Sequence, residues 1–170
     1  MLPTTFLPRC VIADDLRACR KLLESWVEEC GFECDISASA EEAWEAILGS
    51  PPKLIITDIE MPGASGLELL YSLRNHPSEA IRSIPVIVIS SLEDGEIRKF
   101  VDDAGGTCFL SKPLLKELTQ RVVRGLVDFN QLPSEAFPRQ GDSQDYAAKK
   151  ISPILRRIYR DLRQNGPRFQ

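Results

Sequence analysis

Short apolar runs alternate five times with apolar residues at helical spacing along the first 130 residues. The runs are too short for helices and rich in β-branched residues, so each one predicts a strand. The expected strands cover residues 9–13, 33–37, 54–56, 85–89 and 107–110. Five strand–helix units predict an α/β fold, a doubly wound five-stranded parallel sheet with helices on both faces. Right-handed crossovers favour the strand order 2-1-3-4-5.

Polar side chains stand where these strands end. Asp14 and Asp15 follow the first strand, and Asp58 is the first charge after the third. Ser90 follows the fourth strand and Lys112 the fifth. In the expected order these strand ends are close together, so the five side chains should meet in one crevice. A single aspartate at a strand end would be interpreted as a cap of the next helix. The four other polar side chains expected in the same crevice favour a functional role for Asp58.

Three carboxylates at one point repel each other unless one takes up a proton or a cation binds. Mg²⁺ suits such a site because it binds carboxylates together with waters and phosphate oxygens. A carboxylate can also act as a nucleophile and form an aspartyl phosphate. Mg²⁺ and the ammonium of Lys112 would then neutralise charge on the transferred group. The pattern therefore predicts Mg²⁺-dependent phosphoryl transfer.

Five motifs carry a family resemblance. They are DD at 14–15, DIEMPG at 58–63, PVIVIS at 85–90, AGG at 104–106 and FLSKP at 109–113. With them, residues 7 to about 130 resemble the receiver domain of bacterial two-component response regulators, of the chemotaxis-regulator type. The resemblance implies the flavodoxin-like receiver fold. It also implies that a sensor histidine kinase or a histidine phosphotransfer protein phosphorylates Asp58.

The resemblance assigns roles around the phosphoacceptor. It implies that Asp15 binds Mg²⁺ directly, that Asp14 acts mostly through water, and that Asp58 and the backbone carbonyl of Glu60 complete the protein ligands. Lys112 would contact the phosphate, and the Lys112–Pro113 peptide bond would be cis.

The switch residues implied by the resemblance are Ser90 and Phe109. Ser90 would move inward to bond the phosphate, and Phe109 would follow it toward the core. Serine stands at 90 where threonine is commoner, which keeps the hydroxyl. Phenylalanine at 109 cannot offer a hydroxyl to partners. Glu60 and Leu92 occupy positions that tune phosphoryl lifetime in the family.

Three other classes of protein share features with this sequence. A flavodoxin would need donors for a flavin phosphate in the first loop, where Asp14 and Asp15 would repel it. A haloacid-dehalogenase phosphatase has its paired acids and its nucleophile in the opposite order. A phosphorylation-independent adaptor remains the alternative. The resemblance to a receiver implies that the protein is not an enzyme, apart from slow self-catalysed phosphorylation and dephosphorylation of Asp58.

Charge and composition restrict the partners. Residues 1–130 hold 13 Lys and Arg against 21 Asp and Glu, a poor match for nucleic acid. No apolar run approaches the length of roughly 20 residues that a membrane helix needs. Five cysteines without a CxxC pair argue against a disulfide framework or a zinc site. A cytoplasmic protein is expected.

The domain organisation expected is a receiver at 1–130, a linker at 131–152 and a basic amphipathic helix with tail at 153–170. The last 40 residues hold 8 Lys and Arg against 4 Asp and Glu. The tail helix is too short to be stable alone, so it should dock on its own or a sister receiver, or on a partner or an anionic surface. A downstream protein target and a homodimer are expected, through the tail or the face formed by the fourth helix, fifth strand and fifth helix.

Overall fold

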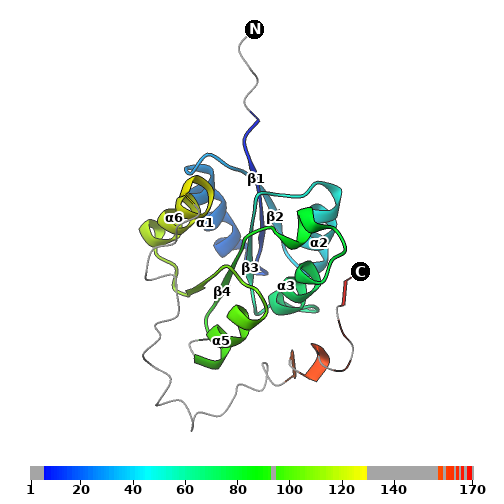
Figure 1. Ribbon diagram of the computed structural model, residues 1–170. Helices are drawn as coiled ribbons and strands as arrows, with labels where there is room; N and C mark the ends of the chain where they lie inside the picture. The colour runs from blue at the N-terminus through cyan, green and yellow to red at the C-terminus, as the bar shows by residue number, and fades with distance from the viewer. Residues whose placement is uncertain are drawn as a thin grey trace.

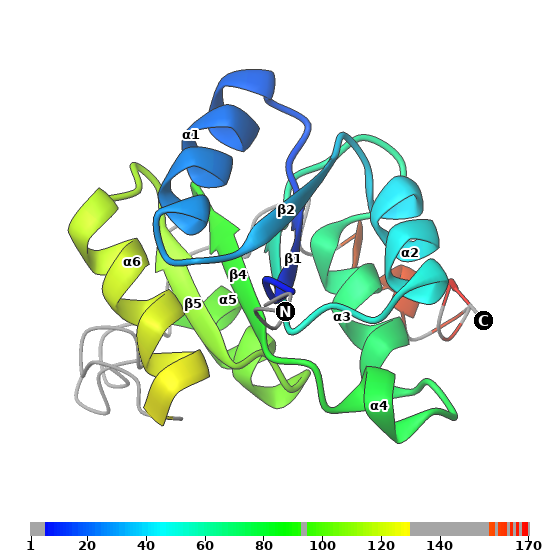
Figure 2. The same ribbon diagram turned by 90° about the horizontal axis from the view of Figure 1, so that it is seen from above.

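Five parallel strands form one sheet in the order β2-β1-β3-β4-β5 (Figures 1 and 2). The computed structural model describes residues 6–92, 95–129, 157–158, 160–162, 164, 166 and 168–169. The strands are β1 (Arg9–Ala13), β2 (Glu33–Ser37), β3 (Leu54–Asp58), β4 (Val86–Ser90) and β5 (Cys108–Ser111). The predicted fold class and strand order are confirmed.

Helices cover both faces of the sheet. They are α1 (Arg17–Glu28), α2 (Ala40–Gly49), α3 (Gly66–Arg74), α4 (Glu79–Arg82), α5 (Gly95–Asp103) and α6 (Lys116–Arg124), which runs into the π-helical turn η1 (Gly125–Phe129). Helices α1 and α6 pack on one face (Figure 2). Helices α2, α3 and α5 pack on the other. The predicted fourth and fifth helices are therefore α5 and α6, and the short α4 was not predicted.

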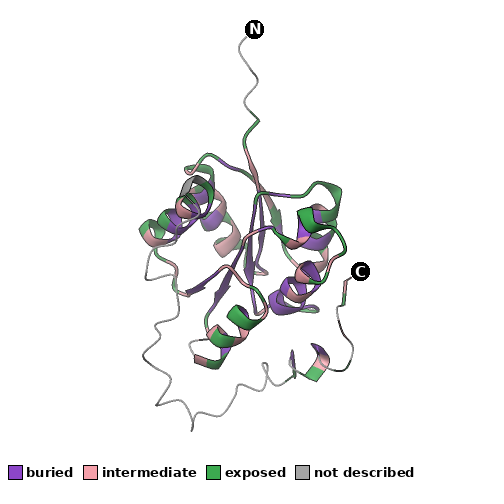
Figure 3. Ribbon diagram, viewed as in Figure 1, coloured by how far each residue is buried: buried purple, intermediate pink, exposed green. Residues whose placement is uncertain are grey.

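The burial pattern explains why the central strands read as continuous apolar runs. All five residues of β3 and of β4 are buried, because helices cover both of their sides (Figure 3). In the edge strand β2 only the last residue, Ser37, is buried, and the other four are exposed or partly buried. The polar ends of β3 and β4, Asp58 and Ser90, are thus buried together with the apolar residues that precede them.

The C-terminal residues that the structure describes pack against the α/β domain. Ile158 and Leu162 are buried in the same apolar cluster as residues of α2, α3 and α5. The expected linker, 131–152, lies outside the described residues. Among the described residues, no helix has the length and apolar character required to cross a membrane.

Candidate functional site

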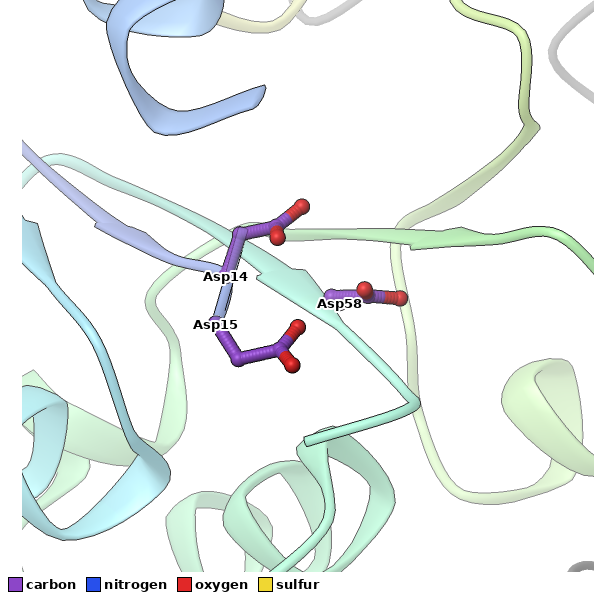
Figure 4. Close-up of side chains that lie close together, drawn as sticks. All are labelled: Asp14, Asp15 and Asp58. Carbon is purple, nitrogen blue, oxygen red and sulfur yellow. The ribbon is translucent and has the colours of Figure 1, made fainter. Parts of the chain in front are cut away.

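Three carboxylates meet at the carboxyl edge of the sheet. Asp14, Asp15 and Asp58 each offer one oxygen, and these oxygens all lie within 4.8 Å of one another (Figure 4). Asp14 follows β1 and Asp58 ends β3, and these strands are direct neighbours in the sheet. Asp14 and Asp58 are buried, whereas Asp15 is half-buried. The structure thus brings together the three acids that the sequence predicted for one site.

Lys112 is the counter-charge of this cluster. Its Nζ donates to Asp14 Oδ2 at 2.9 Å and to Asp58 Oδ2 at 2.7 Å. Its backbone N–H donates to Ser90 O at 2.8 Å, which places Lys112 directly after β5 and beside β4. The Lys112–Pro113 peptide bond is cis, as predicted.

Burial and charge set the protonation of the pair. Burial raises the pKa of Asp58, and the charge of Asp14 adds to that rise, while Lys112 acts to lower the pKa. For Lys112, burial lowers the pKa, but the hydrogen bonds and charges of the two aspartates outweigh it and raise the pKa overall. Lys112 is therefore a cation at neutral pH and offsets part of the repulsion between the carboxylates.

Hydrogen bonds hold the loop after β1, which carries Asp14 and Asp15. The amide of Leu16 donates to Asp14 Oδ1 at 2.8 Å. Arg20 donates to the carbonyls of Asp14 and Asp15 at 2.5 and 2.9 Å. These hydrogen bonds therefore fix the backbone from which the Asp14 and Asp15 carboxylates extend. Arg20 was not singled out from the sequence, because an arginine in the first turn of a helix carries no specific signal.

The β3–α3 loop, residues 59–65, turns sharply after Asp58. The amide of Glu60 donates to Asp58 Oδ1 at 3.3 Å, and the amide of Gly66 donates to Ile59 O at 3.2 Å. A Cβ at Gly66 would lie 1.9 Å from Asp58 O, so only glycine fits there. Ser65 caps α3 in a reciprocal capping box. Gly66 is a site-supporting residue that the sequence analysis missed.

Ser90 ends β4, and Phe109 lies in the neighbouring strand β5. Ser90 is fully buried, and its Oγ accepts a hydrogen bond from the amide of Leu92 at 3.0 Å. The Phe109 ring is 4% exposed, and Arg98 Cζ lies 4.8 Å from the ring centroid. Phe109 is therefore buried in this structure, with Arg98 over its ring, and its movement with Ser90 stays a prediction.

Two polar contacts near the site were not predicted. Ser91 Oγ donates to Glu60 Oε2 and so joins the loops that follow β3 and β4. Cys19 lies close to Asp14, and burial, with a hydrogen bond to Asp14 as the second cause, raises the pKa of its thiol to about 12. The thiol is protonated at neutral pH, which excludes a thiolate nucleophile at this position.

Comparison with known proteins finds matches over the α/β domain that carries the site. Residues 10–123 match the family described as the response regulator receiver domain. The response regulator Rre1 of Synechocystis sp. is 30% identical over 138 residues, which are 79% of this chain and 58% of that protein. The sensory/regulatory protein RpfC of Xanthomonas campestris pv. campestris is 33% identical over 107 residues, 63% of this chain and 15% of that protein.

The similarity to solved structures extends over the receiver. The receiver domain of the Francisella response regulator 1452 has a TM-score of 0.64 and 26% identity, covering 70% of this chain and 95% of that one. By contrast, this chain spans less than two thirds of the length of Rre1 and of RpfC. The comparisons therefore concern the receiver and not the whole of those relatives.

Proposed function

We propose that this chain, which belongs to the family of response regulator receiver domains, is a phosphorylation-controlled switch of a two-component system with Asp58 as its phosphoryl acceptor. The observation that carries the proposal is the site itself. Three carboxylates lie within 4.8 Å of one another, and Lys112 donates to two of them. The alternative, a phosphorylation-independent adaptor, has no need for such an arrangement.

The donor set fits Mg²⁺. Hard oxygen ligands from Asp14, Asp15 and Asp58 converge on one point, and the buried pair among them carries more negative charge than Lys112 alone offsets. We assign the ion to these three residues and the backbone carbonyl of Glu60. When bound, Mg²⁺ would supply positive charge next to the phosphoryl oxygens.

The residues of the chain perform the transfer. A carboxylate oxygen of Asp58 attacks the phosphorus of a phosphohistidine, the O–P bond forms as the N–P bond breaks, and the imidazole leaves with the bonding electrons and takes up a proton. Asp58 must be ionised to attack, and Lys112 favours that form. After the transfer, Lys112 Nζ would exchange its contact with Asp58 for one with a phosphoryl oxygen.

Signal output would begin at Ser90. Its Oγ accepts the Leu92 amide, so its hydroxyl can donate to a phosphoryl oxygen while the loop after β4 stays attached to it. That new bond would alter the face formed by α5, β5 and α6, where Phe109 and Arg98 are stacked. We assign the downstream protein target, or a second copy of the chain, to this face.

The remaining proposals concern the context of the switch. The phosphoryl donor is a sensor histidine kinase or a histidine phosphotransfer protein, and the place of action is the cytoplasm. Receiver, linker and tail are assigned to residues 1–130, 131–152 and 153–170. Apart from slow self-catalysed phosphorylation and dephosphorylation of Asp58, no enzymatic activity is assigned to the chain.

Phosphorylation by a small donor tests the proposal. With Mg²⁺ and acetyl phosphate, the intact chain should gain one phosphoryl group, which hydroxylamine removes because it is an acyl phosphate. Asp58→Asn should gain none, whereas the control Asp102→Asn, on the exposed side of α5, should be labelled like the unmodified protein. Equal labelling of Asp58→Asn would refute the assignment. An unmodified protein that no donor labels, but that still binds its target, would be an adaptor.

A further inference from the structure

The described part of the C-terminal segment, residues 157–169, lies against the receiver on the side of α2 and α3 (Figures 1 and 2). Ile158 is 2% exposed and Leu162 8%, four residues apart on one helical face. The amide of Gly166 donates to Leu162 O at 3.2 Å, and Gly166 has a φ of +67°. Glycine adopts this conformation without strain, so the helix ends there and the chain turns toward α2 and α3.

An aromatic contact fixes the end of the segment. The Phe169 ring stacks on Trp44 of α2, with ring centroids 5.3 Å apart and an interplanar angle of 25°. The ring of His76 also contacts Trp44 edge-on, with centroids 5.8 Å apart. The amide of Phe169 donates to Ser72 Oγ of α3 at 3.3 Å. One residue of the segment is thus held by both helices, through its ring and through its backbone.

A basic side chain lies between two carboxylates beside this aromatic contact. Arg168 places one nitrogen 3.7 Å from Glu41 Oε1 of α2 and another 3.7 Å from Glu68 Oε1 of α3. The surface formed by α2 and α3 therefore offers an aromatic ring and two acids at the spacing of an adjacent arginine and phenylalanine. Such charge complementarity favours a basic partner and selects its register.

The same two carboxylates also hold the loop that follows the phosphoacceptor strand. Glu41 Oε1 accepts the amide of Ala64 at 3.3 Å, and Glu68 Oε2 accepts the amide of Ser65 at 2.6 Å. Arg168 touches both carboxylates, so the segment is two contacts away from the β3–α3 loop. A movement of the Glu41 or Glu68 carboxylate would therefore change its hydrogen bond to the backbone amide of Ala64 or Ser65.

We propose that the surface formed by α2 and α3 is a docking site for an arginine–aromatic peptide, that the C-terminal segment of the same molecule occupies it through Ile158, Leu162, Arg168 and Phe169, and that this occupancy restrains the β3–α3 loop. Two arguments select the chain's own segment as the occupant. Its apolar stripe is buried in the receiver's cluster, and its arginine complements two acids of an otherwise acidic domain. The inference does not depend on phosphorylation of Asp58.

Hydrogen–deuterium exchange of the full 170-residue chain tests the docking. Phe169→Ala should speed amide exchange in α2, α3 and residues 59–65 by roughly tenfold, since a stacked aromatic pair is worth up to about 1.5 kcal/mol. Arg168→Gln should speed it about two- to fivefold, as expected for an exposed ion pair. Arg160→Gln is the matched control: Arg160 is exposed on the same segment, and its removal should leave exchange unchanged.

Each other outcome would overturn a defined part of the proposal. Unaltered exchange in α2 and α3 in both variants would refute the docking site. Faster exchange in α2 and α3, with residues 59–65 unaffected, would refute the restraint on the loop. Protection that falls when the protein is diluted tenfold, with a doubled mass in light scattering at the higher concentration, would assign the occupant to a second copy. Unchanged exchange in β1 and β4 shows in every case that the variant is folded.

Discussion

Two basic side chains in this protein each lie between two carboxylates, and they differ in burial. Lys112 donates to Asp14 and Asp58 at 2.9 and 2.7 Å, and its side chain is 17% exposed. Arg168 lies 3.7 Å from each of its two glutamates, and its side chain is 50% exposed. The first group lies at the carboxyl edge of the sheet, and the second contacts the C-terminal segment at the surface.

The difference shows what burial does to the same arrangement of charges. In a buried site, removal of one partner leaves an uncompensated charge that water solvates poorly. At the surface, water and salt replace a lost partner at little cost. The acidic cluster at the sheet edge therefore contains electrostatic repulsion that a bound cation can relieve, whereas Glu41 and Glu68 contact Arg168, whose side chain is half exposed to solvent.

The largest effect should follow removal of Lys112. Lys112→Ala should lower the free energy of unfolding without Mg²⁺ by about 3 kcal/mol, the low end of the range for breaking a buried pair, because the Lys112 side chain is 17% exposed. Millimolar Mg²⁺ should restore part of this loss by binding the native carboxylates. Urea unfolding with and without Mg²⁺ measures both effects.

Lys116→Ala is the control for this prediction. Lys116 also pairs with a carboxylate, Glu29, at 2.8 Å, but both side chains are nearly half exposed. Its removal should change the free energy of unfolding by less than about 1 kcal/mol and show no response to Mg²⁺. Equal losses in the two variants would show that burial does not separate the two kinds of ion pair.

The second effect is a gain in stability when Asp58 loses its charge. The pKa of Asp58 is raised, chiefly by burial, so the native state binds a proton at this group more tightly than the unfolded chain does. The ionised group therefore costs stability once the pH exceeds its unfolded pKa, and the cost reaches its full size above the native pKa.

Asp58→Asn should accordingly be more stable than the unmodified protein at pH 7, by about 0.5–2 kcal/mol, the usual gain from relieving one unfavourable site. The gain should shrink toward zero as the pH falls to the ordinary aspartate value, 3.8. Urea unfolding at a series of pH values gives the curve. A variant that is less stable at pH 7 would mean that the contact of Asp58 with Lys112 outweighs its burial.

The sequence predicted which charged residues meet at the sheet edge because each of them is tied to a strand end. A buried strand ends where its apolar run ends, and a parallel sheet brings those ends together, so local pattern sufficed for Asp14, Asp58 and Lys112. Gly66 was not predicted, because its role depends on how closely α3 approaches the Asp58 carbonyl. Such a distance belongs to tertiary packing and leaves no mark on the local sequence.

The docking surface was predicted only in general terms. A tail helix that docks on a receiver was expected, but α2 and α3 were not foreseen as its contacts. Glu41 and Glu68 occur in the first turns of their helices, where acids are ordinary, and nothing in the sequence pairs them with Arg168. The partners of a short segment are set by three-dimensional complementarity between distant residues.

The smallest effect tests the surface side of the comparison directly. Arg168→Gln should lower the free energy of unfolding by no more than about 1 kcal/mol, because half of the side chain is in water and each contact spans 3.7 Å. The loss should vanish in 1 M NaCl, where screening acts within about 3 Å, whereas the loss caused by Lys112→Ala should persist there because water and ions have little access to a buried pair. Urea unfolding of both variants at low and high salt measures the two losses under the same conditions. If Arg168→Gln were as costly as Lys112→Ala and equally insensitive to salt, the C-terminal segment would be part of the receiver's core, and exposure would be the wrong basis for separating the two sites.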